Sequence, residues 1–375
     1  MAKPARPKSS DWPLVAARLA TRFPHEALHP GAMETAWADV EQERKKGARR
    51  PTHWAVAFSG GADSLALVLL LWAHGEGRWG RDFVALHFNH GLRGRAADAD
   101  EKFCAQVCAA LGVRFVAGRW RTARKGASEA EARAARFEFF GREMARWKIR
   151  LLWLGHQQDD IAESMIMRLA RGSGSAGLAA PRPAQPMPGG RLHVRPLLAF
   201  KKTEITAALR ASGAVWREDA TNAGDDFFRN RVRRSVLPAW RRAAGRDALA
   251  GAALSRALLE EDDAALEAWT DKLFGVGAQT CCALAGGRKR KGRSKPAPLE
   301  LGLAALSGVP RAVVRRVLRR WLLSLPDSGD LSRQGFEVLL AAVERGAATR
   351  FSLGRSGFAV IRRGRLLWER TRRSG

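Results

Sequence analysis

A Ser-Gly-Gly turn stands between an apolar run and an apolar helix start, in the segment Ser59-Gly60-Gly61-Ala62-Asp63-Ser64. Glycines let the backbone curl so that several N–H groups point into one concavity, and the following helix N-terminus adds partial positive charge. Such a turn suits a phosphate group, and the carboxylate of Asp63 in the first helical turn can hold magnesium against phosphates. The Gly-Lys-Ser/Thr ending of the P-loop is missing, which argues against transfer of a terminal phosphoryl group.

A second group of polar residues, His156, Asp160 and Glu163, follows another apolar run. On a helix beginning near Gln158, the two carboxylates are three positions apart and share a face, with the imidazole just before the first turn. A carboxylate pair with an imidazole suits metal binding, proton transfer or the capture of a cationic amine.

The elements that must position these residues form an alternating series. We expect strands at residues 54–58, 83–88, 113–117 and 151–154, and helices at 64–74, 97–111, 128–147, 160–169 and 202–211. Short strands alternating with helices of ten or more residues predict an α/β fold around a parallel sheet. The polar segments at 59–64, 89–93 and 155–163 would then lie at the carboxyl ends of strands, where open α/β sheets bind ligands.

Composition divides the chain into three parts. Residues 1–50 are polar, basic and contain proline, so we expect an extension that precedes the fold, with one helix at 33–46. Residues 51–239 form the expected α/β domain, with a loop at 181–190. Residues 240–375 form a smaller, mainly helical domain, with helices at 313–323 and 336–344, a basic linker at 286–298 and a hairpin over 351–368.

The charge of the chain favours a polyanionic partner. Lys and Arg number 65 against 37 Asp and Glu, giving a net charge of +28, and seven arginines lie between Arg229 and Arg246 without one acidic residue. Nucleic acid is the first partner to consider. A membrane surface is the weaker alternative, because no long amphipathic apolar face accompanies the basic runs, and a merely solvated basic surface is a further one. The longest apolar stretch, 65–73, is too short to span a bilayer, and the N-terminus lacks an apolar signal region, so we expect a cytoplasmic protein.

The four cysteines predict no metal–thiolate site. Cys104 and Cys108 are four positions apart, and Cys281 and Cys282 are adjacent, so no CxxC pair occurs. Cys104 and Cys108 are expected as small buried hydrophobic residues of a helix.

The SGGxDS pattern resembles the PP-loop of the ATP pyrophosphatases, which cleave between the α and β phosphates of ATP. Further motifs follow it in order: NHGLR at 89–93, EAEARAARF at 129–137, GHQQDDIAES at 155–164, RGSGSAGL at 171–178, RPLL at 195–198, DATN at 219–222 and FRNRVR at 228–233. This ordered set, over residues 52–234, is similar to that of the tRNA(Ile)-lysidine synthetase family. The part after residue 240 is more diffusely similar to the family's helical substrate domain.

The resemblance implies a two-step reaction. ATP adenylylates C2 of the cytidine at the anticodon wobble position, and the amino group of free lysine then displaces AMP. The implied cofactors are ATP and Mg²⁺, and the implied partners are tRNA(Ile) with a CAU anticodon and free L-lysine, while a homodimer stays open.

The resemblance also implies roles for individual residues. Residues 59–64 and His90 would bind ATP, and Asp63 and Asp160 would hold magnesium or place lysine. His156 would contact the activated phosphate or transfer a proton, Glu163 would serve the lysine side, and Arg229 would neutralise phosphate charge. The remaining residues expected to bind substrate are Arg93, Glu129, Arg133, Arg136, Arg171, Asn230 and Arg233.

Two positions depart from the family pattern. Gln157 stands where relatives tend to carry a second His, and Phe137 stands where they carry Tyr. Neither change removes a charged group. Longer members carry an additional domain after the central one, which this sequence does not lead us to expect.

Three other functions stay open at this point. A PP-loop tRNA thiolase would carry sulfur on reactive cysteines or an iron–sulfur cluster, for which the cysteine spacing gives no sign. A synthetase using ammonia would normally need a glutaminase and would have less need for so basic a chain. A non-catalytic RNA-binding protein with a vestigial ATP site would not need Asp63, His156, Asp160 and Glu163 together.

Overall fold

The structure is a computed structural model, and it describes residues 11–45, 54–75, 83–91, 94–120, 127–218, 227–284, 300–325 and 331–370. The chain divides into two compact units, 1–260 and 261–375. This division differs from the expected boundary at 239/240, because helix α11 (Ala248–Leu284) runs from the first unit into the second.

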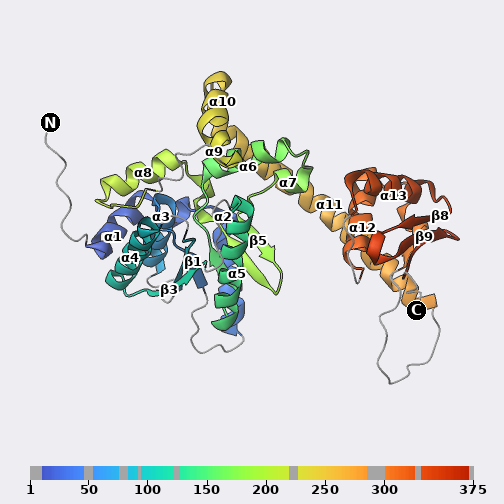
Figure 1. Cartoon of the computed structure of the whole chain (residues 1–375), viewed down its shortest axis with the longest axis horizontal. Helices are drawn as coiled ribbons and strands as arrows, with labels where there is room; N and C mark the ends of the chain where they lie inside the picture. Colours follow the sequence, from blue (N-terminus) through green and yellow to red (C-terminus); the bar gives the residue numbers. More distant parts are fainter. Residues whose placement is uncertain are drawn as a thin grey trace. The chain divides into compact units, whose positions relative to one another are not determined.

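The first unit is built on a six-stranded sheet with the order β3-β2-β1-β4-β6-β5 (Figure 1). The strands are β1 Trp54–Ala57, β2 Phe83–Asn89, β3 Arg114–Arg119, β4 Leu151–Trp153, β5 Ala184–Met187 and β6 Arg191–Val194. All neighbours pair in parallel except β5 with β6. The predicted α/β fold is therefore confirmed, with one antiparallel edge strand. That strand corrects the loop expected at 181–190; Pro186 in it is tolerated because β5 is an edge strand.

Helices cover both faces of this sheet, as buried parallel strands require (Figure 1). Trp54 and Val56 of β1 face the cluster formed with α1, α3, α4 and α8, whereas Ala55 faces α5. The helical elements are α1 Trp12–Arg22, η1 His25–Ala27, α2 Pro30–Lys45, α3 Ala62–Gly75, α4 Arg95–Ala110, α5 Glu129–Arg146, α6 Gln158–Leu169, α7 Ser175–Leu178, η2 Pro196–Ala199, α8 Lys202–Ala211, α9 Phe228–Arg231, the π-helical η4 Val232–Val236 and α10 Leu237–Ala244.

The N-terminal segment belongs to this fold, which corrects the extension expected at 1–50. Helix α1 begins after Asp11, whose side chain accepts a hydrogen bond from the Leu14 N–H at 3.2 Å. Its apolar face, with Val15 and Leu19, is buried in the same cluster as α3, and α2 adds Met33 to that cluster. Residues 12–36 therefore complete the core; residues 1–10 and 46–50 lie outside the described residues.

The second unit has its own core between helices and an antiparallel sheet of order β7-β10-β9-β8. Its further elements are β7 Leu301–Gly302, η5 Leu303–Leu306, α12 Arg311–Leu323, α13 Arg333–Arg345, β8 Thr349–Ser352, η6 Gly354–Ser356, β9 Phe358–Arg362 and β10 Arg365–Glu369. The expected hairpin is confirmed as β9 and β10, joined at Arg363 and Gly364, which both have positive φ. The expected basic linker at 286–298 lies outside the described residues.

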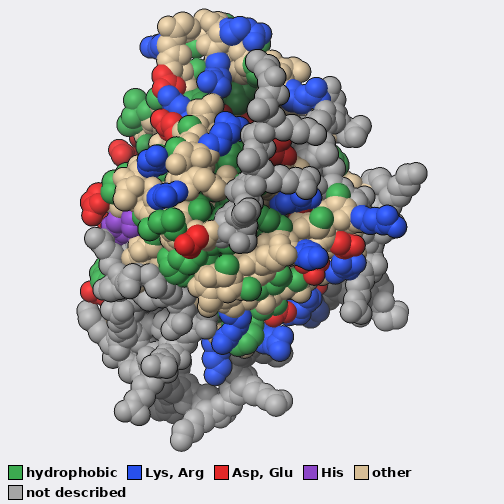
Figure 2. All heavy atoms as spheres, turned by 90° about the vertical axis from the view of Figure 1, so that its left-hand side faces the viewer, with side chains coloured by type: hydrophobic (Ala, Val, Ile, Leu, Met, Phe, Trp, Pro, Cys, Tyr) green, Lys and Arg blue, Asp and Glu red, His purple; other side chains and the backbone are tan. Residues whose placement is uncertain are grey.

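Cations are prominent on the surface. Figure 2 shows one face of the molecule, on which Lys and Arg side chains lie among apolar and acidic ones, and several gather at the top, the end where Figure 1 places α10. Among the described residues, no helix combines the length and apolarity that crossing a membrane requires.

Candidate active site

The Ser-Gly-Gly turn between β1 and α3 is closed by its own serines. The Ser59 and Ser64 hydroxyl oxygens lie 3.0 Å apart, the Ser59 N–H donates to Ser64 Oγ at 3.2 Å, and Ser64 Oγ donates to the Gly61 carbonyl at 3.1 Å. Gly60 has φ +87°, and a Cβ there would lie 3.1 Å from Cys104 Sγ, so the turn needs glycine at this position. The first N–H groups of α3 have no intrahelical acceptor, so the turn suits an anionic ligand.

Asp63 in the first turn of α3 forms an ion pair with Lys202 at the start of α8. Lys202 Nζ donates to Asp63 Oδ2 at 2.6 Å, while Asp63 Oδ1 is buried without a hydrogen-bond partner. Burial raises the pKa of Asp63, and the Lys202 ammonium opposes that rise. A buried carboxylate oxygen left without a donor is the ligand type that Mg²⁺ prefers. Within the described ranges, no three His, Cys, Asp or Glu side chains form a ready metal site, so a magnesium ion here would also need ligand phosphates.

The end of β4 packs directly against this turn. A Cβ at Gly155 would lie 3.0 Å from the backbone C and O of Asp63, so only glycine permits the approach. The close approach places His156, the next residue, beside the Ser-Gly-Gly turn.

Arg195 determines the hydrogen-bonding state of His156. Arg195 Nε donates to His156 Nδ1 at 3.0 Å, so the imidazole accepts at Nδ1 and carries its proton on Nε2. Burial lowers the pKa of His156 to about 3, and Arg195 and Arg229 contribute to that lowering. His156 is therefore a neutral hydrogen-bond donor at neutral pH, which favours the expected contact with a phosphate over proton abstraction.

Asp160 uses both carboxylate oxygens within the protein. Oδ2 accepts from the Gln157 N–H at 3.0 Å, which closes the capping box at the start of α6, and Oδ1 accepts from Arg229 Nη2. Burial alone would raise the pKa of Asp160, but Arg229, His156 and the Gln157 N–H hold it below its ordinary value. The expected metal role of Asp160 therefore has no unpaired oxygen to support it, although its charge does act on Asp63.

Glu163 is also fully engaged. Its side chain is 1% exposed; Oε2 accepts from Arg229 Nε and Arg233 Nη2, both at 2.9 Å, and Oε1 accepts from Arg233 Nε at 2.6 Å. Arg168, a helical neighbour, instead donates to the Gly177 carbonyl at 2.6 Å. Glu163 thus anchors Arg229 and Arg233, and its expected contact with lysine stays a prediction without geometric support.

Helix α5 brings two further arginines to this group. The guanidinium carbons of Arg133 and Arg136 lie 4.7 and 5.5 Å from the ring centre of Phe137, which also packs against the His193 ring at 5.3 Å and the Phe140 ring at 5.8 Å. Burial lowers the pKa of Arg136 to about 10, with Arg133 and Arg229 adding to it. Three arginines thus act on His156, namely Arg133 on α5, Arg229 on α9 and Arg195 just after β6. They outnumber the one carboxylate that acts on it, Asp160.

The other predicted residues are less closely associated. Glu129 is exposed in the first turn of α5, and Asn230 is buried on α9 between the two anchored arginines. His90 follows β2 and packs edge-on against Phe88, 4.9 Å between ring centres. Arg171 is exposed at the opposite end of α6 from Asp160. Arg93 and the DATN motif at 219–222 lie outside the described residues.

Three residues of this site were missed by sequence reasoning. Lys202 and Arg195 join elements far apart in the sequence, although the RPLL motif contained Arg195. Arg217 is the third: its N–H donates to the Gly60 carbonyl at 3.0 Å, and its Nε donates to the buried Asp100 at 2.7 Å. Arg217 therefore holds the back of the Ser-Gly-Gly turn. No local pattern marked Lys202 or Arg217, because each contacts a residue more than 100 positions away in the sequence.

Residues 34–240 match the sequence profile of the PP-loop domain, which is more than half of the chain. The chain belongs to the PP-loop family. The matched residues include the Ser-Gly-Gly turn at 59–64, which we call the PP-loop. It contains Asp63, His156 lies beside it, and the charge of Asp160 acts on Asp63.

Three relatives of this PP-loop protein share the name tRNA(Ile)-lysidine synthase. A tRNA(Ile)-lysidine synthase of Symbiobacterium thermophilum is 34% identical over 78% of this chain and 59% of its own length. Those of Solibacter usitatus and Pseudomonas aeruginosa are 42% and 35% identical over 49% and 73% of this chain, and 40% and 60% of their own lengths. The chain thus spans about half the length of the curated relatives it matches. A solved U34-tRNA thiolase from Methanococcus maripaludis has a TM-score of only 0.45 at 18% identity, covering 60% of this chain and 78% of that one.

Proposed function

We propose that this protein is a carbon–nitrogen ligase that makes lysidine in the cytoplasm. It would use ATP to activate C2 of the wobble cytidine of a tRNA(Ile) with a CAU anticodon and then join free L-lysine to that carbon. The observation that carries the proposal is the meeting of the PP-loop, the Asp63–Lys202 pair and the arginine-surrounded His156 at one edge of the sheet. The names of the relatives supply the substrate.

The first step needs positive charge around a crowded phosphate chain. The cytidine O2 would attack the α-phosphorus of ATP, forming a C2–O–phosphorus link as pyrophosphate leaves. The PP-loop N–H groups and Lys202 would receive the departing phosphates, and His156 would donate from Nε2 to an α-phosphate oxygen. Arg133 and Arg229 add charge that would stabilise the developing anion.

Magnesium has one fitting ligand among the described residues. Asp63 Oδ1 would hold the ion, since it is buried and has no donor. A bound Mg²⁺ would neutralise phosphate charge. Lys202 donates to Oδ2, so its ammonium is the group that would be shared between Asp63 and the nucleotide phosphates.

The second step needs a carboxylate that can place an ammonium. The lysine amino group, once deprotonated, would attack C2 and release AMP, and its proton would pass to water. Asp160, with 10% of its side chain exposed, is more accessible than Glu163 at 1%. Arg229 holds the pKa of Asp160 down, so this carboxylate is ionised, which favours placing lysine over removing its proton.

The alternative thiolase activity has little support among the described cysteines. Cys104 and Cys108 are buried, and burial raises the pKa of both thiols, that of Cys108 to about 12. A thiol of that kind does not form the nucleophilic thiolate at neutral pH. The side chains of Cys281 and Cys282 lie outside the described residues.

The direct test is AMP release that depends on both tRNA and lysine. The protein is incubated with ATP, each amino acid in turn and a tRNA(Ile) transcript, with a transcript carrying uridine at the wobble position as control. Lysine-specific AMP release with the cytidine transcript alone supports the proposal. Release driven by sulfide instead of lysine would assign a thiolase, and no pyrophosphate under any condition would leave a non-catalytic RNA-binding protein.

A further inference from the structure

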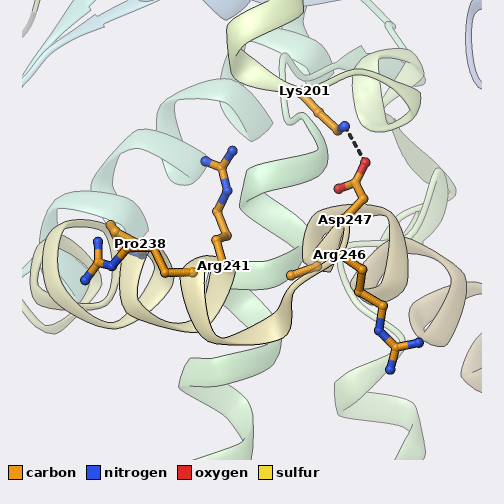
Figure 3. Close-up of a pocket in the computed structure, with 7 residues that line it drawn as sticks. Lys201, Pro238, Arg241, Arg246 and Asp247 are labelled. Carbon is orange, nitrogen blue, oxygen red and sulfur yellow. Dashed lines mark hydrogen bonds and ion pairs between the residues drawn. The ribbon is translucent and has the colours of Figure 1, made fainter.

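A basic hollow on the surface adjoins the site but contributes nothing to the chemistry described so far. It has a volume of about 490 Å³ and is lined by residues of α10, the turn that follows it and the start of α8 (Figure 3). Its charged residues are Lys201, Arg241, Arg242, Arg246 and Asp247.

The single carboxylate of the hollow is already neutralised. Asp247 Oδ1 accepts from the Ala250 N–H at 3.2 Å, which caps α11, and Oδ2 accepts from Lys201 Nζ (Figure 3). The hydrogen bond with Asp247 raises the pKa of Lys201, while the charge of Arg241 works against that rise.

The three arginines have no such partner. Arg241, Arg242 and Arg246 are exposed, and none of them makes an ion pair with a carboxylate in the part of the chain that the structure describes. Arg229 and Arg233, from the same arginine-rich stretch, are bound internally to Glu163. Lining by three uncompensated guanidinium groups fits an extended anion with several separate charges, because guanidinium binds phosphate oxygens through paired N–H groups.

The backbone joins this hollow to the PP-loop. Lys201 points to Asp247 in the hollow, while the next residue, Lys202, reaches Asp63 at 2.6 Å. Consecutive Cα atoms are about 3.8 Å apart. The start of α8 therefore contributes one lysine to the hollow and the next lysine to the PP-loop.

We propose that this hollow binds the phosphodiester backbone of the RNA substrate, through Arg241, Arg242 and Arg246, next to the nucleotide that is modified. The inference rests on the proposed function for the identity of the RNA. A membrane surface fits less well, because α10 has only eight residues and Trp240 is its one exposed large apolar side chain, while Leu237 is buried in the protein.

The test measures binding of the unmodified tRNA(Ile) transcript as a function of salt. The variant Arg241→Gln/Arg242→Gln/Arg246→Gln should bind roughly ten- to a hundredfold more weakly, and the slope of log Kd against log salt should fall by about two, the value for three lost phosphate contacts. The matched control is Arg18→Gln/Arg22→Gln/Lys102→Gln, which removes three exposed cations from α1 and α4. This control should bind RNA like the wild type.

A second variant changes binding in the opposite direction. Asp247→Asn keeps a good helix cap but removes the one negative charge and releases Lys201. It should therefore tighten RNA binding and steepen its salt dependence, a result that unfolding cannot produce.

Three outcomes would overturn the inference. The first is a triple variant that matches the control in Kd and salt slope. The second is an Asp247→Asn variant that binds RNA no tighter than the wild type, and the third is a triple variant that loses binding to phosphatidylserine vesicles while it keeps RNA binding. Failure of the proposed function looks different. In that case the wild type binds RNA through the hollow but releases no lysine-dependent AMP.

Discussion

Replacing Glu163 by Gln tests whether this residue anchors arginines or places lysine. The substitution keeps the size of the side chain but removes its charge. The NH2 group of glutamine is a hydrogen-bond donor, so it would face the guanidinium groups of Arg229 and Arg233, which are also donors. Glu163 is 1% exposed and accepts three hydrogen bonds from Arg229 and Arg233. Breaking a buried ion pair costs about 3–5 kcal/mol. Arg233 is 37% exposed and water can replace part of its partner, so we expect a loss of about 2–3 kcal/mol.

This loss is measurable as a melting temperature and as kinetics. A loss of 2–3 kcal/mol corresponds to a drop of about 4–12 °C for a unit of this size. Because Arg229 and Arg233 then keep only Asp160 as an ionic partner among the described residues, kcat/KM should fall for ATP, tRNA and lysine together. The control Glu204→Gln changes an exposed capping residue, whose carboxylate accepts the Lys201 N–H at 2.7 Å, and should cost less than about 1 kcal/mol.

One result would refute the anchoring role. If Glu163→Gln melts like the wild type and raises only the KM for lysine, by tenfold or more, then Glu163 contacts lysine directly.

Three further predictions concern charge and protonation. Asp63→Asn should abolish pyrophosphate release with little change in melting temperature; release near the wild-type rate would exclude Asp63 from the ATP step. Lys202→Gln should tighten Mn²⁺ binding, measured by electron paramagnetic resonance without nucleotide, because no ammonium then competes for Asp63. The same variant should weaken binding of a non-hydrolysable ATP analogue. If the affinities for Mn²⁺ and for the analogue both rise or both fall, Lys202 is not shared between Asp63 and the nucleotide. Burial lowers the pKa of His193 to about 4 and that of His156 to about 3. As the pH falls below about 6.5, these histidines take up protons in the unfolded chain but not in the folded one, so the free energy of unfolding declines. The decline is at most about 1.4 kcal/mol per pH unit for each histidine. Urea unfolding at pH 7 and pH 5 measures this decline, and His193→Gln should make it shallower.

Local sequence signals predicted the sheet and most of its helices. Helix α8 begins and ends at the predicted residues, and Ser128 caps α5 with the box that its Glu131 allows. Strand β5 was missed because its four residues include a proline and show only weak alternation of apolar and polar side chains. The strand pairs only with β6. Helix α1 had a readable signal: a capping Asp11 and apolar residues at spacings of three and four from Trp12 to Leu19.

The site was predicted less completely than the fold. Asp63, His156, Asp160 and Glu163 were found because each follows a strand end, which is a local property. Their partners were not, since an ion pair such as Lys202 with Asp63 depends on how two distant helices pack. The same limit applies to Glu163, whose partners Arg229 and Arg233 are 66 and 70 residues away in the sequence.

The packing of α1 sets an order of events during synthesis. Helix α1 is synthesised before its main packing partner, α3, which begins about 40 residues after Arg22. At about 5–20 residues per second, the apolar face of α1 waits roughly 2–8 seconds for this partner. We therefore expect nascent chains that stop before Ala62 to be cut by protease within α1, and chains that include α3 to be protected there.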